Sequence, residues 1–434
     1  MIDETGAGIP PAPVLQMRRH PSAPSWWGYL GREGLPVSGD ARYWAPGDFE
    51  QVNGFPRYPV SEMERRHRWV AETMSERGID LLIVGGPTGP LETSVQYFSN
   101  WPSQVQSYLL FSPGEATLLL VRLWNHLPDA KRIAMIEDVQ YGGDAPDEQG
   151  EKVATLAAER NVRRIGLIGV IPHADLTSIQ QGNPEATLVD LNTAYQRFRL
   201  VKSPAEMVFV DIASKMNDAA IDALATELRP GVNEYEVARI VEDVYNSHRA
   251  WNLIHFSLST PMEAPEICVP HQYHPDRALQ AGDVFVTEIS TTFWGYSGQI
   301  LRTFTIASDP TPRYERLHDV ALDAYNGIVE VLRPGTTVGE VLDAAQVITD
   351  AGFDIWDDLV HGFGGAYLPP IVRTRANRGA SHPDDFEYPD GTLLVVQPNV
   401  IDGQAGVQTG NSLQITPDGA VSTQHQPTRM IRCG

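Results

Sequence analysis

The second half of the chain contains an internal repeat, and this repeat constrains the fold more than any other feature of the sequence. The segment "LRPGVNEYEV" begins at Leu228, and the similar segment "LRPGTTVGEV" begins at Leu332. In both copies a Leu-Arg-Pro-Gly turn leads into a helical pattern with a glutamate at the same place, Glu236 or Glu340. The repeat therefore predicts two related α/β halves that together form one domain.

Strand-like and helical runs alternate before the repeat, which predicts a smaller α/β domain. A helix is expected from residue 61, with Ser61 as its cap. A long helix is expected to open at Ser203, because Pro204 suits the first helical position and Glu206 completes a capping box. This helix places the domain boundary near residue 200, between domains at 61–200 and 201–434. The other predicted elements are strands at 79–86, 107–112, 116–123, 164–170 and 186–191 and a helix at 151–162.

Residues 1–60 differ from the rest in composition. They are rich in proline, glycine and aromatic residues, including Trp26, Trp27 and Trp44. So many aromatic side chains argue against free disorder. We expect an N-terminal arm that packs on its own domain or on a partner subunit.

The charge of the chain excludes two classes of partner. Its formal net charge is −22, whereas nucleic acids and anionic membranes require basic patches.

Two cysteines, Cys268 and Cys433, exclude a disulfide framework. No apolar run approaches the ~20 residues of a membrane span, and the N-terminus does not have the pattern of a signal peptide. The sequence therefore predicts a cytoplasmic protein.

The segment "TEISTTFWGYSGQILRTFTI", residues 287–306, has the pattern of two strands joined by a tight turn. β-Branched and aromatic residues alternate on both sides of the Trp-Gly-Tyr sequence that ends at Tyr296. A hairpin of this kind presents side chains to a pocket. Its only carboxylate is Glu288, and its other inward candidates are neutral: Ser290, Tyr296 and Gln299.

From about residue 60 onward the chain resembles the pita-bread family of creatinase, prolidase and methionine aminopeptidase, the peptidase M24 superfamily. The resemblance lies in the hairpin and in four further segments. It implies an α/β (α+β) fold, with a small N-terminal α/β domain before a pita-bread domain that has an internal pseudo-twofold duplication. The four segments are "RLVKSPAEM" (199–207), "HGFGG" (361–365), "GTLLVVQPNV" (391–400) and "GVQTGNSLQIT" (406–416).

The same resemblance implies that the metal-binding positions of the family have changed. In the metallopeptidase branch, two aspartates, a histidine and two glutamates bridge two metal ions. A pair of hard cations needs several carboxylates, which favours a protein without metal or other cofactor. The five positions hold Glu288, Gln299, His361, Gln397 and Gly410, the last beside Asn411.

The creatinase branch works without metal, and the chain resembles it in the loss of ligands. The histidine that serves creatinase as general acid and base aligns with His271. Two glutamates that hold a guanidinium group align with Leu301 and Gln397, and a carboxylate-binding arginine aligns with Gln106. The resemblance therefore predicts a metal-independent, creatinase-like hydrolase that cleaves a C–N bond in a small neutral polar molecule.

Three residues are the predicted catalytic groups. His271 would transfer protons, since a neutral imidazole takes and returns a proton at working pH. His361 would donate a hydrogen bond to an oxyanion. Glu288, between apolar strands, would have a raised pKa that suits an acid or base, or it would pair with Arg302. The predicted substrate-binding residues are Gln397, Asn411, Gln299, Gln408, Tyr296, Tyr97, Trp101 and Gln106.

Several alternatives stay open on the sequence alone. Each candidate histidine could also have a structural role without catalysis, His271 as a loop residue and His361 as a buried core residue. Cys268 and His271 would suit a nucleophilic pair, and His271, His274, His361 and Glu288 would suit a single metal ion. The pocket would also suit a lyase, an isomerase or a non-catalytic binding protein on a decayed peptidase scaffold. The resemblance further implies a homodimer in which the loop with Tyr97, Trp101 and Gln106 covers the neighbouring pocket.

Overall fold

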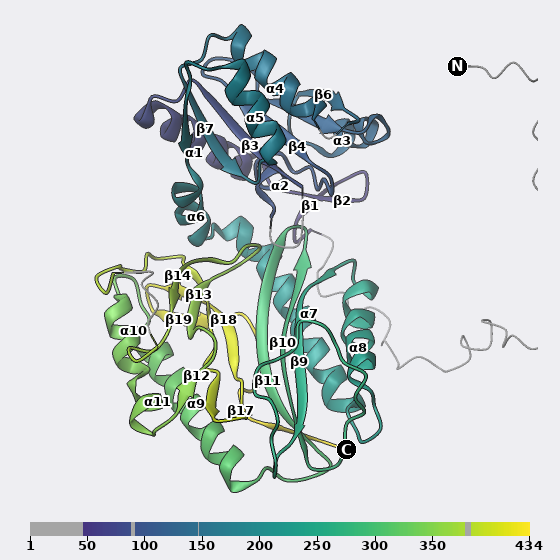
Figure 1. The fold of residues 1–434 in the computed structure, drawn as a ribbon, viewed down its shortest axis with the longest axis vertical. Helices are drawn as coiled ribbons and strands as arrows, with labels where there is room; N and C mark the ends of the chain where they lie inside the picture. Colours follow the sequence, from purple (N-terminus) through teal and green to yellow (C-terminus); the bar gives the residue numbers. More distant parts are fainter. Residues whose placement is uncertain (1–46, 88–91, 146, 378–382) are drawn as a thin grey trace, which may run out of the picture. The chain divides into compact units, whose positions relative to one another are not determined.

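The computed structural model describes residues 47–87, 92–145, 147–377 and 383–434 (Figure 1). Most of the predicted N-terminal arm, residues 1–46, lies outside the described residues. The remainder of the arm contains a short antiparallel hairpin of β1 (Glu50–Val52) and β2 (Phe55–Arg57).

The predicted small α/β domain contains a six-stranded sheet. β3, β7 and β8 run parallel to one another, β4 is antiparallel to both of its neighbours, and β5 and β6 are parallel. The sequence missed β6 because this strand has few apolar residues, and it lies at the edge of the sheet. The strand order is β6 (Asp138–Gly143), β5 (Leu118–Arg122), β4 (Ser107–Phe111), β3 (Leu81–Gly86), β7 (Arg164–Gly169) and β8 (Thr187–Asp190).

Alternate residues of the buried strand β3 enter different hydrophobic clusters, as the pleat of a strand requires. Leu82 and Val84 pack with Val70 of α1, whereas Leu81 and Ile83 pack in the cluster that contains helix α4. Helix α1 begins after Pro59 without a side-chain cap, so the prediction of Ser61 as cap is wrong. The helices of this domain are α1 (Val60–Arg77), α2 (Ser94–Ser99), α3 (Leu127–Ile133), α4 (Glu148–Glu159), α5 (His173–Gly182) and α6 (Asn192–Leu200).

The second domain is built on a nine-stranded sheet, to which β19 (Gly419–Ser422) and β20 (Ile431–Cys433) contribute short pairings. A separate small sheet contains β12 (Asp354–Ile355), β16 (Val400–Asp402) and β17 (Ala405–Gly406). The main order is β14 (Leu368–Val372), β13 (Val360–Gly362), β15 (Leu393–Val396), β18 (Gly410–Thr416), β11 (Tyr296–Ile306), β10 (Asp283–Phe293) and β9 (Trp251–Pro261). Its helices are α7 (Pro204–Glu227), α8 (Glu234–Ser247), α9 (Pro312–Val331), α10 (Val338–Ala344) and α11 (Gln346–Asp350).

The internal repeat produces the same local structure twice. The glycine of each turn has a positive φ, +90° in the first copy and +87° in the second. Two residues later, Asn233 caps α8 and Thr337 caps α10, and each forms a capping box with the repeated glutamate, Glu236 or Glu340. Ser203 and Glu206 form the predicted capping box at the start of α7. These helix starts are confirmed because capping depends on neighbouring residues alone.

The hairpin of β10 and β11 is also confirmed. Phe293 pairs with Tyr296, so the connecting loop consists of Trp294 and Gly295. Both loop residues have positive φ, which matches the right-handed twist of the strands. Along β10, Phe285 and Ile289 pack in the cluster that contains α7, whereas Val286 packs in the cluster that contains α9. Glu288 lies two residues after Val286 on the same strand, so its side chain is on the same face of the sheet as that of Val286.

None of the helices within the described ranges is long and apolar enough to span a membrane.

Candidate functional site

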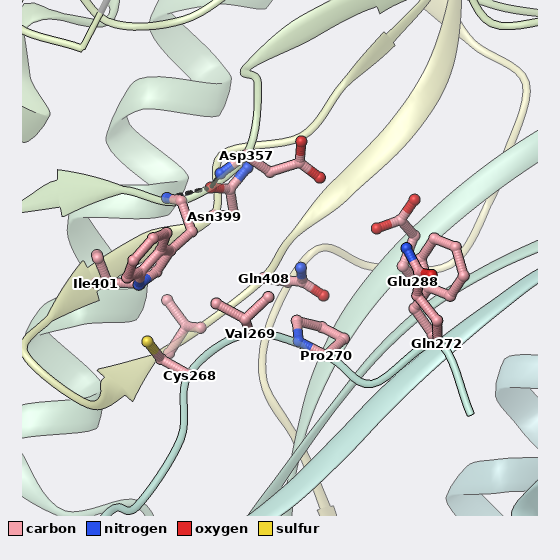
Figure 2. Close-up of a pocket in the computed structure, with 12 residues that line it drawn as sticks. Cys268, Val269, Pro270, Gln272, Glu288, Asp357, Asn399, Ile401 and Gln408 are labelled. Carbon is pink, nitrogen blue, oxygen red and sulfur yellow. Dashed lines mark hydrogen bonds between the residues drawn. The ribbon is translucent and has the colours of Figure 1, made fainter. Parts of the chain in front are cut away.

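A cavity of about 250 Å³ lies beside Glu288 of β10. Its wall is formed by β9, β10, the segment 268–272, the residues before β13 and the segment from Asn399 to Gln408. Figure 2 shows Glu288 and Gln272 at one end and Cys268 and Ile401 at the other. The lining residues are Phe256, Cys268, Val269, Pro270, Gln272, Glu288, Trp356, Asp357, Asn399, Ile401, Val407 and Gln408.

Glu288 is a buried carboxyl group with 6% of its surface exposed. Its Oε1 accepts a hydrogen bond of 2.5 Å from Nε2 of Gln299, which lies on the facing strand. Burial raises the pKa of Glu288 from 4.5 to about 8, and the charges of Asp357 and Asp358 add to this rise. No basic side chain in the described ranges lies within ion-pair distance of it. The predicted direction of the pKa shift therefore agrees with the structure, and its largest cause is burial.

A chain of hydrogen bonds connects Glu288 to His361. Gln299 donates from the same Nε2 to Oε1 of Gln397 at 3.1 Å, and Gln397 donates to Oδ1 of Asp358 at 3.4 Å. Asp358 in turn binds His361. The structure thus brings together Glu288, Gln299, Gln397 and His361, four residues that the sequence had placed at the site.

Asp358 and His361 form a buried pair. The carboxylate Oδ1 lies 2.8 Å from Nδ1 of the imidazole, and the two side chains are 1% and 2% exposed. The hydroxyl of Tyr367 donates to the other carboxylate oxygen. A neutral ring that donates from Nδ1 keeps Nε2 as an acceptor, and Nε2 has no hydrogen-bond partner among the described residues. This arrangement holds an imidazole in one tautomer and leaves Nε2 buried without a partner among the described residues, next to the cavity but outside its lining.

Asp358, Asp357 and Tyr367 were not predicted from the sequence. Asp358 lies three residues before His361, on the far side of a short irregular segment, and Tyr367 follows a glycine-rich turn. The run "DDLVHG" carried a signal, since an acidic residue near a candidate histidine is a common orienting partner. Only the bend of the chain between Asp358 and β13 shows that the two side chains meet.

Gln408 lines the pocket as predicted, and its buried Oε1 has no hydrogen-bond partner in the described part of the chain. Asn411 lies elsewhere, since its side chain accepts from Arg302 and donates to Tyr325. Arg302 also donates to backbone carbonyl groups at Leu301, Gly410 and Gln426. The alternative of a Glu288–Arg302 ion pair is therefore wrong.

The structure does not bring His271 to this cluster. Its backbone pairs with Ser257 of β9, and the neighbouring residues Pro270 and Gln272 line the pocket while His271 does not. In an extended segment the side chain between two pocket residues points to the opposite side. A role for His271 as the general acid and base stays a prediction, and no contact to the cluster supports it.

The two alternatives that involve His271, a nucleophilic pair with Cys268 and a single metal site with His274, also lack the side-chain contacts they would need. The thiol of Cys268 donates to the carbonyl group of Gly403, and burial raises its pKa, which disfavours a thiolate nucleophile. His274 contacts Ser257 and the ring of His255, not Glu288. Among the residues that the structure describes, no three His, Cys, Asp or Glu side chains are grouped so that they hold a metal ion.

Two predicted substrate-binding tyrosines lie in a separate buried cluster. The guanidinium of Arg66 donates to the hydroxyl of Tyr296 at 2.8 Å, and its charge lies 4.0 Å from the centre of the Tyr97 ring. Tyr296 also donates to Glu206. Trp101 is buried in the core of the small domain. Gln106 donates to a backbone carbonyl in that same domain.

The metal pair of the metallopeptidases does not fit these residues. Gln299 and Gln397 are neutral, and Gly410 has no side chain. A Cβ at Gly410 would lie 2.6 Å from the carbonyl oxygen of Val396 and 2.8 Å from Cα of Gln397, so the backbone leaves no room for a carboxylate there. Glu288 and His361 remain, which is too few ligands for two cations.

Comparison with known proteins shows that the chain is similar to peptidases. Residues 209–417 match the metallopeptidase family M24, and residues 66–201 match the creatinase/prolidase N-terminal domain. The Xaa-Pro dipeptidase of Pyrococcus furiosus is 22% identical over 82% of this chain and 97% of its own. The Xaa-Pro aminopeptidase of Escherichia coli is 24% identical over 64% and 70%.

The fold is that of solved prolidase structures. The prolidase of Pyrococcus horikoshii OT3 superposes with a TM-score of 0.71 at 19% identity, over 84% of this chain and 99% of that one. The pita-bread fold with a small N-terminal α/β domain is therefore confirmed.

These comparisons contradict the predicted activity. The relatives are named dipeptidases and aminopeptidases. The sequence had predicted a metal-independent, creatinase-like hydrolase of non-peptide C–N bonds that is not a metallopeptidase. This prediction is wrong. The error came from treating the loss of ligands at three of the five positions as kinship with the creatinase branch. A few side chains in a pocket change independently of the fold and do not identify a branch.

Proposed function

The chain carries an M24 domain behind a creatinase/prolidase N-terminal domain, and from this premise we propose that it hydrolyses the peptide bond of a short peptide. The peptidase relatives support the reaction class. The observation that carries the proposal is the Asp358–His361 pair, because peptide hydrolysis needs a group that takes a proton from water and returns it to the amine.

In this proposal His361 acts through Nε2. A water oxygen bonds to the peptide carbonyl carbon while its proton moves to Nε2. The C–N bond then breaks, and Nε2 returns the proton to the leaving nitrogen, so the imidazole ends in its starting state. Asp358 stabilises the imidazolium that forms between the two steps and keeps the ring oriented, as Tyr367 and Gln397 hold the carboxylate in place.

The size of the pocket limits the substrate. A cavity of about 250 Å³ lies below the roughly 300–1,000 Å³ of sites for drug-sized ligands. We therefore propose a dipeptide or tripeptide as the substrate.

We also propose a homodimer in which the loop with Tyr97, Trp101 and Gln106 covers a neighbouring pocket. Light scattering of the purified protein tests this oligomeric state.

The test is a cleavage assay on the full chain with a mixed dipeptide library, followed by mass spectrometry. Cleavage yields two amino acids whose summed mass exceeds that of the dipeptide by one water. His361→Gln is expected to lower kcat by about 10²–10⁴-fold, which is the usual share of general acid–base catalysis. The exposed His173→Gln is the control. Assays with a chelator and with added Mn²⁺, Zn²⁺ or Co²⁺ run in parallel.

The proposal is overturned if no dipeptide is cleaved under any of these conditions. It is also overturned if His361→Gln cleaves as fast as the wild type.

A further inference from the structure

The pocket beside Glu288 has an apolar section that leads to a polar end. Val269, Pro270, Ile401 and Val407 contribute aliphatic surface, and the exposed Trp356 adds an aromatic ring. Figure 2 shows Val269 and Pro270 between Ile401 at one end and Glu288 at the other. A surface of this kind suits a ligand with a methylene stem, because such stems bury their length along apolar walls.

The polar end presents hydrogen-bond acceptors in excess of donors. Glu288 and Asp357 contribute carboxylates to the lining, and Gln408 contributes an amide. Oε1 of Gln408 is buried without a partner among the described residues, and so is Oε1 of Gln299 beside Glu288. A buried acceptor without a donor costs about 1–3 kcal/mol. The polar end therefore favours a ligand group that donates several hydrogen bonds and accepts none.

The charge at this end is also uncompensated. Asp357 and Asp358 both act on Glu288. Among the described residues, Asp358 pairs with His361, and Oδ1 of Asp357 accepts a hydrogen bond from the backbone N–H of Asp358, whereas Glu288 has only an amide donor. The charges of His361 and of the exposed Arg373 also reach Asp357, but Arg373 forms no ion pair with either carboxylate in the described ranges. A cation in the pocket would offset the mutual repulsion of these carboxylates.

From these observations we infer that the pocket binds the basic side chain of a lysine or arginine, with its stem along Val269 and Pro270 and its cationic head at Glu288. An ammonium or guanidinium group donates three to five hydrogen bonds and accepts none, which matches the unfilled acceptors. This inference rests on the proposed function only for the statement that the ligand is a peptide. It reverses the expectation of a neutral ligand, which overlooked Asp357 and Asp358.

The α-ammonium of a peptide is a second source of the same chemistry. It has no methylene stem, so the apolar section between Ile401 and Glu288 favours the side chain. Calorimetric titration of the full chain separates the two sources. The probes are Nα-acetyl-lysine amide, which has only the side-chain cation, acetyl-norleucine amide, which has the stem without the cation, and glycinamide, which has only the α-ammonium.

The expected result is that acetyl-lysine amide binds at least tenfold tighter than acetyl-norleucine amide and glycinamide. Glu288→Gln keeps the shape of the side chain and removes its charge, and it should abolish this preference. Asp357→Asn should reduce it several-fold. Glu266→Gln is the matched control, because Glu266 is exposed on the segment that leads to the pocket and its loss changes the net charge equally.

Equal binding of the lysine and norleucine probes by the wild type would overturn the inference, and so would a preference for glycinamide. A preference that survives in both Glu288→Gln and Asp357→Asn, each shown by circular dichroism to be folded, would overturn it as well. The titration needs no turnover. Repeating it with His361→Gln separates it from the proposed function, because that variant should lose cleavage and keep the preference.

Discussion

Two buried groups of charged side chains in the described part of the chain differ in how completely their charges and hydrogen bonds are paired. At the cluster around Arg66, the guanidinium donates to Glu62, to the backbone carbonyl group of Tyr97 and to the hydroxyl of Tyr296. Two aromatic rings lie against its charge. At the pocket, Glu288 has one amide donor and two neighbouring carboxylates. The first group has its partners within the chain, and the second requires them from a ligand.

This difference separates a structural charge cluster from a binding site. Burying a charge is costly unless it is paired and hydrogen-bonded. Around Arg66, hydrogen bonds and ion pairs within the chain compensate the buried charge, so the cluster stabilises the fold. Around Glu288 buried acceptors lack donors among the described residues, and burial with two neighbouring carboxylates raises the pKa of Glu288 to about 8, so ionising this group reduces stability unless a cation binds.

The largest expected effect is on stability at the paired cluster. Arg66→Met should lower the free energy of unfolding by about 3–5 kcal/mol, because it leaves buried Glu62 and Glu206 with fewer partners. Urea denaturation measures this loss. Arg132→Met is the control, since Arg132 is exposed and pairs with the exposed Asp129, and it should cost at most about 1 kcal/mol. Equal losses in the two variants would refute the description of the Arg66 cluster as structural.

The second effect concerns the unpaired carboxyl. The pKa of Glu288 is about 8 in the folded protein and near 4.5 when exposed, so the folded state keeps a proton that the unfolded state releases. Its contribution to stability is complete below pH 4.5 and is lost as the pH rises to about 8. Glu288→Gln should therefore gain stability over the wild type by roughly 1.4 kcal/mol per pH unit between pH 5 and 8. Urea denaturation at pH 5, 6.5 and 8 measures this gain, and a constant difference would contradict the assignment.

The third effect is on ligand affinity. A cation binds the ionised form of Glu288, and below pH 8 this form is the minor one. The affinity for acetyl-lysine amide should rise about tenfold per pH unit from pH 6 to 7 and level off above pH 8. Calorimetric titration at four pH values gives the profile. With Glu266→Gln the profile should be unchanged, whereas a flat profile in the wild type would place the cation away from Glu288.

The smallest effect is expected at Tyr367. Tyr367→Phe removes one hydrogen bond to Asp358 and leaves the Asp358–His361 contact in place. The turnover of a cleaved dipeptide should fall by about three- to tenfold, which corresponds to a hydrogen bond of roughly 0.5–1.5 kcal/mol. Tyr235→Phe, which changes an exposed tyrosine, is the control. A loss as large as that of His361→Gln would mean that Tyr367 itself takes part in proton transfer.

Much of the fold could be predicted from the sequence because its signals are local. The repeated turns, the capping boxes at Ser203, Asn233 and Thr337 and the two-residue hairpin loop depend on residues within one or two turns of each other. The exceptions are also local in origin. β6 has too few apolar residues to show a strand pattern, and Pro59 replaced the expected serine at the start of α1.

The site was only partly predictable. Glu288, Gln299, Gln397 and His361 were named from the family resemblance and do meet. Asp358 and Asp357 were not named, because no sequence pattern shows that the segment before β13 turns its carboxylates toward β10. Tyr97 and Tyr296 were assigned to the substrate and instead hold Arg66. A tyrosine has the same appearance in a sequence whether its hydroxyl meets a ligand or an arginine.

The sequence by itself determined the duplication and the helix starts at Ser203, Asn233 and Thr337, and through the family resemblance it indicated the loss of carboxylates that a pair of metal ions needs. These properties depend on residue type and on neighbours along the chain. The tertiary structure alone decided which charges are compensated. Arg66 meets Tyr296 across 230 positions, and Glu288 lies near Asp357 and Asp358 with no basic side chain of the described residues in ion-pair distance of it. Electrostatic interactions depend on distance and burial in space, and separation along the chain fixes neither.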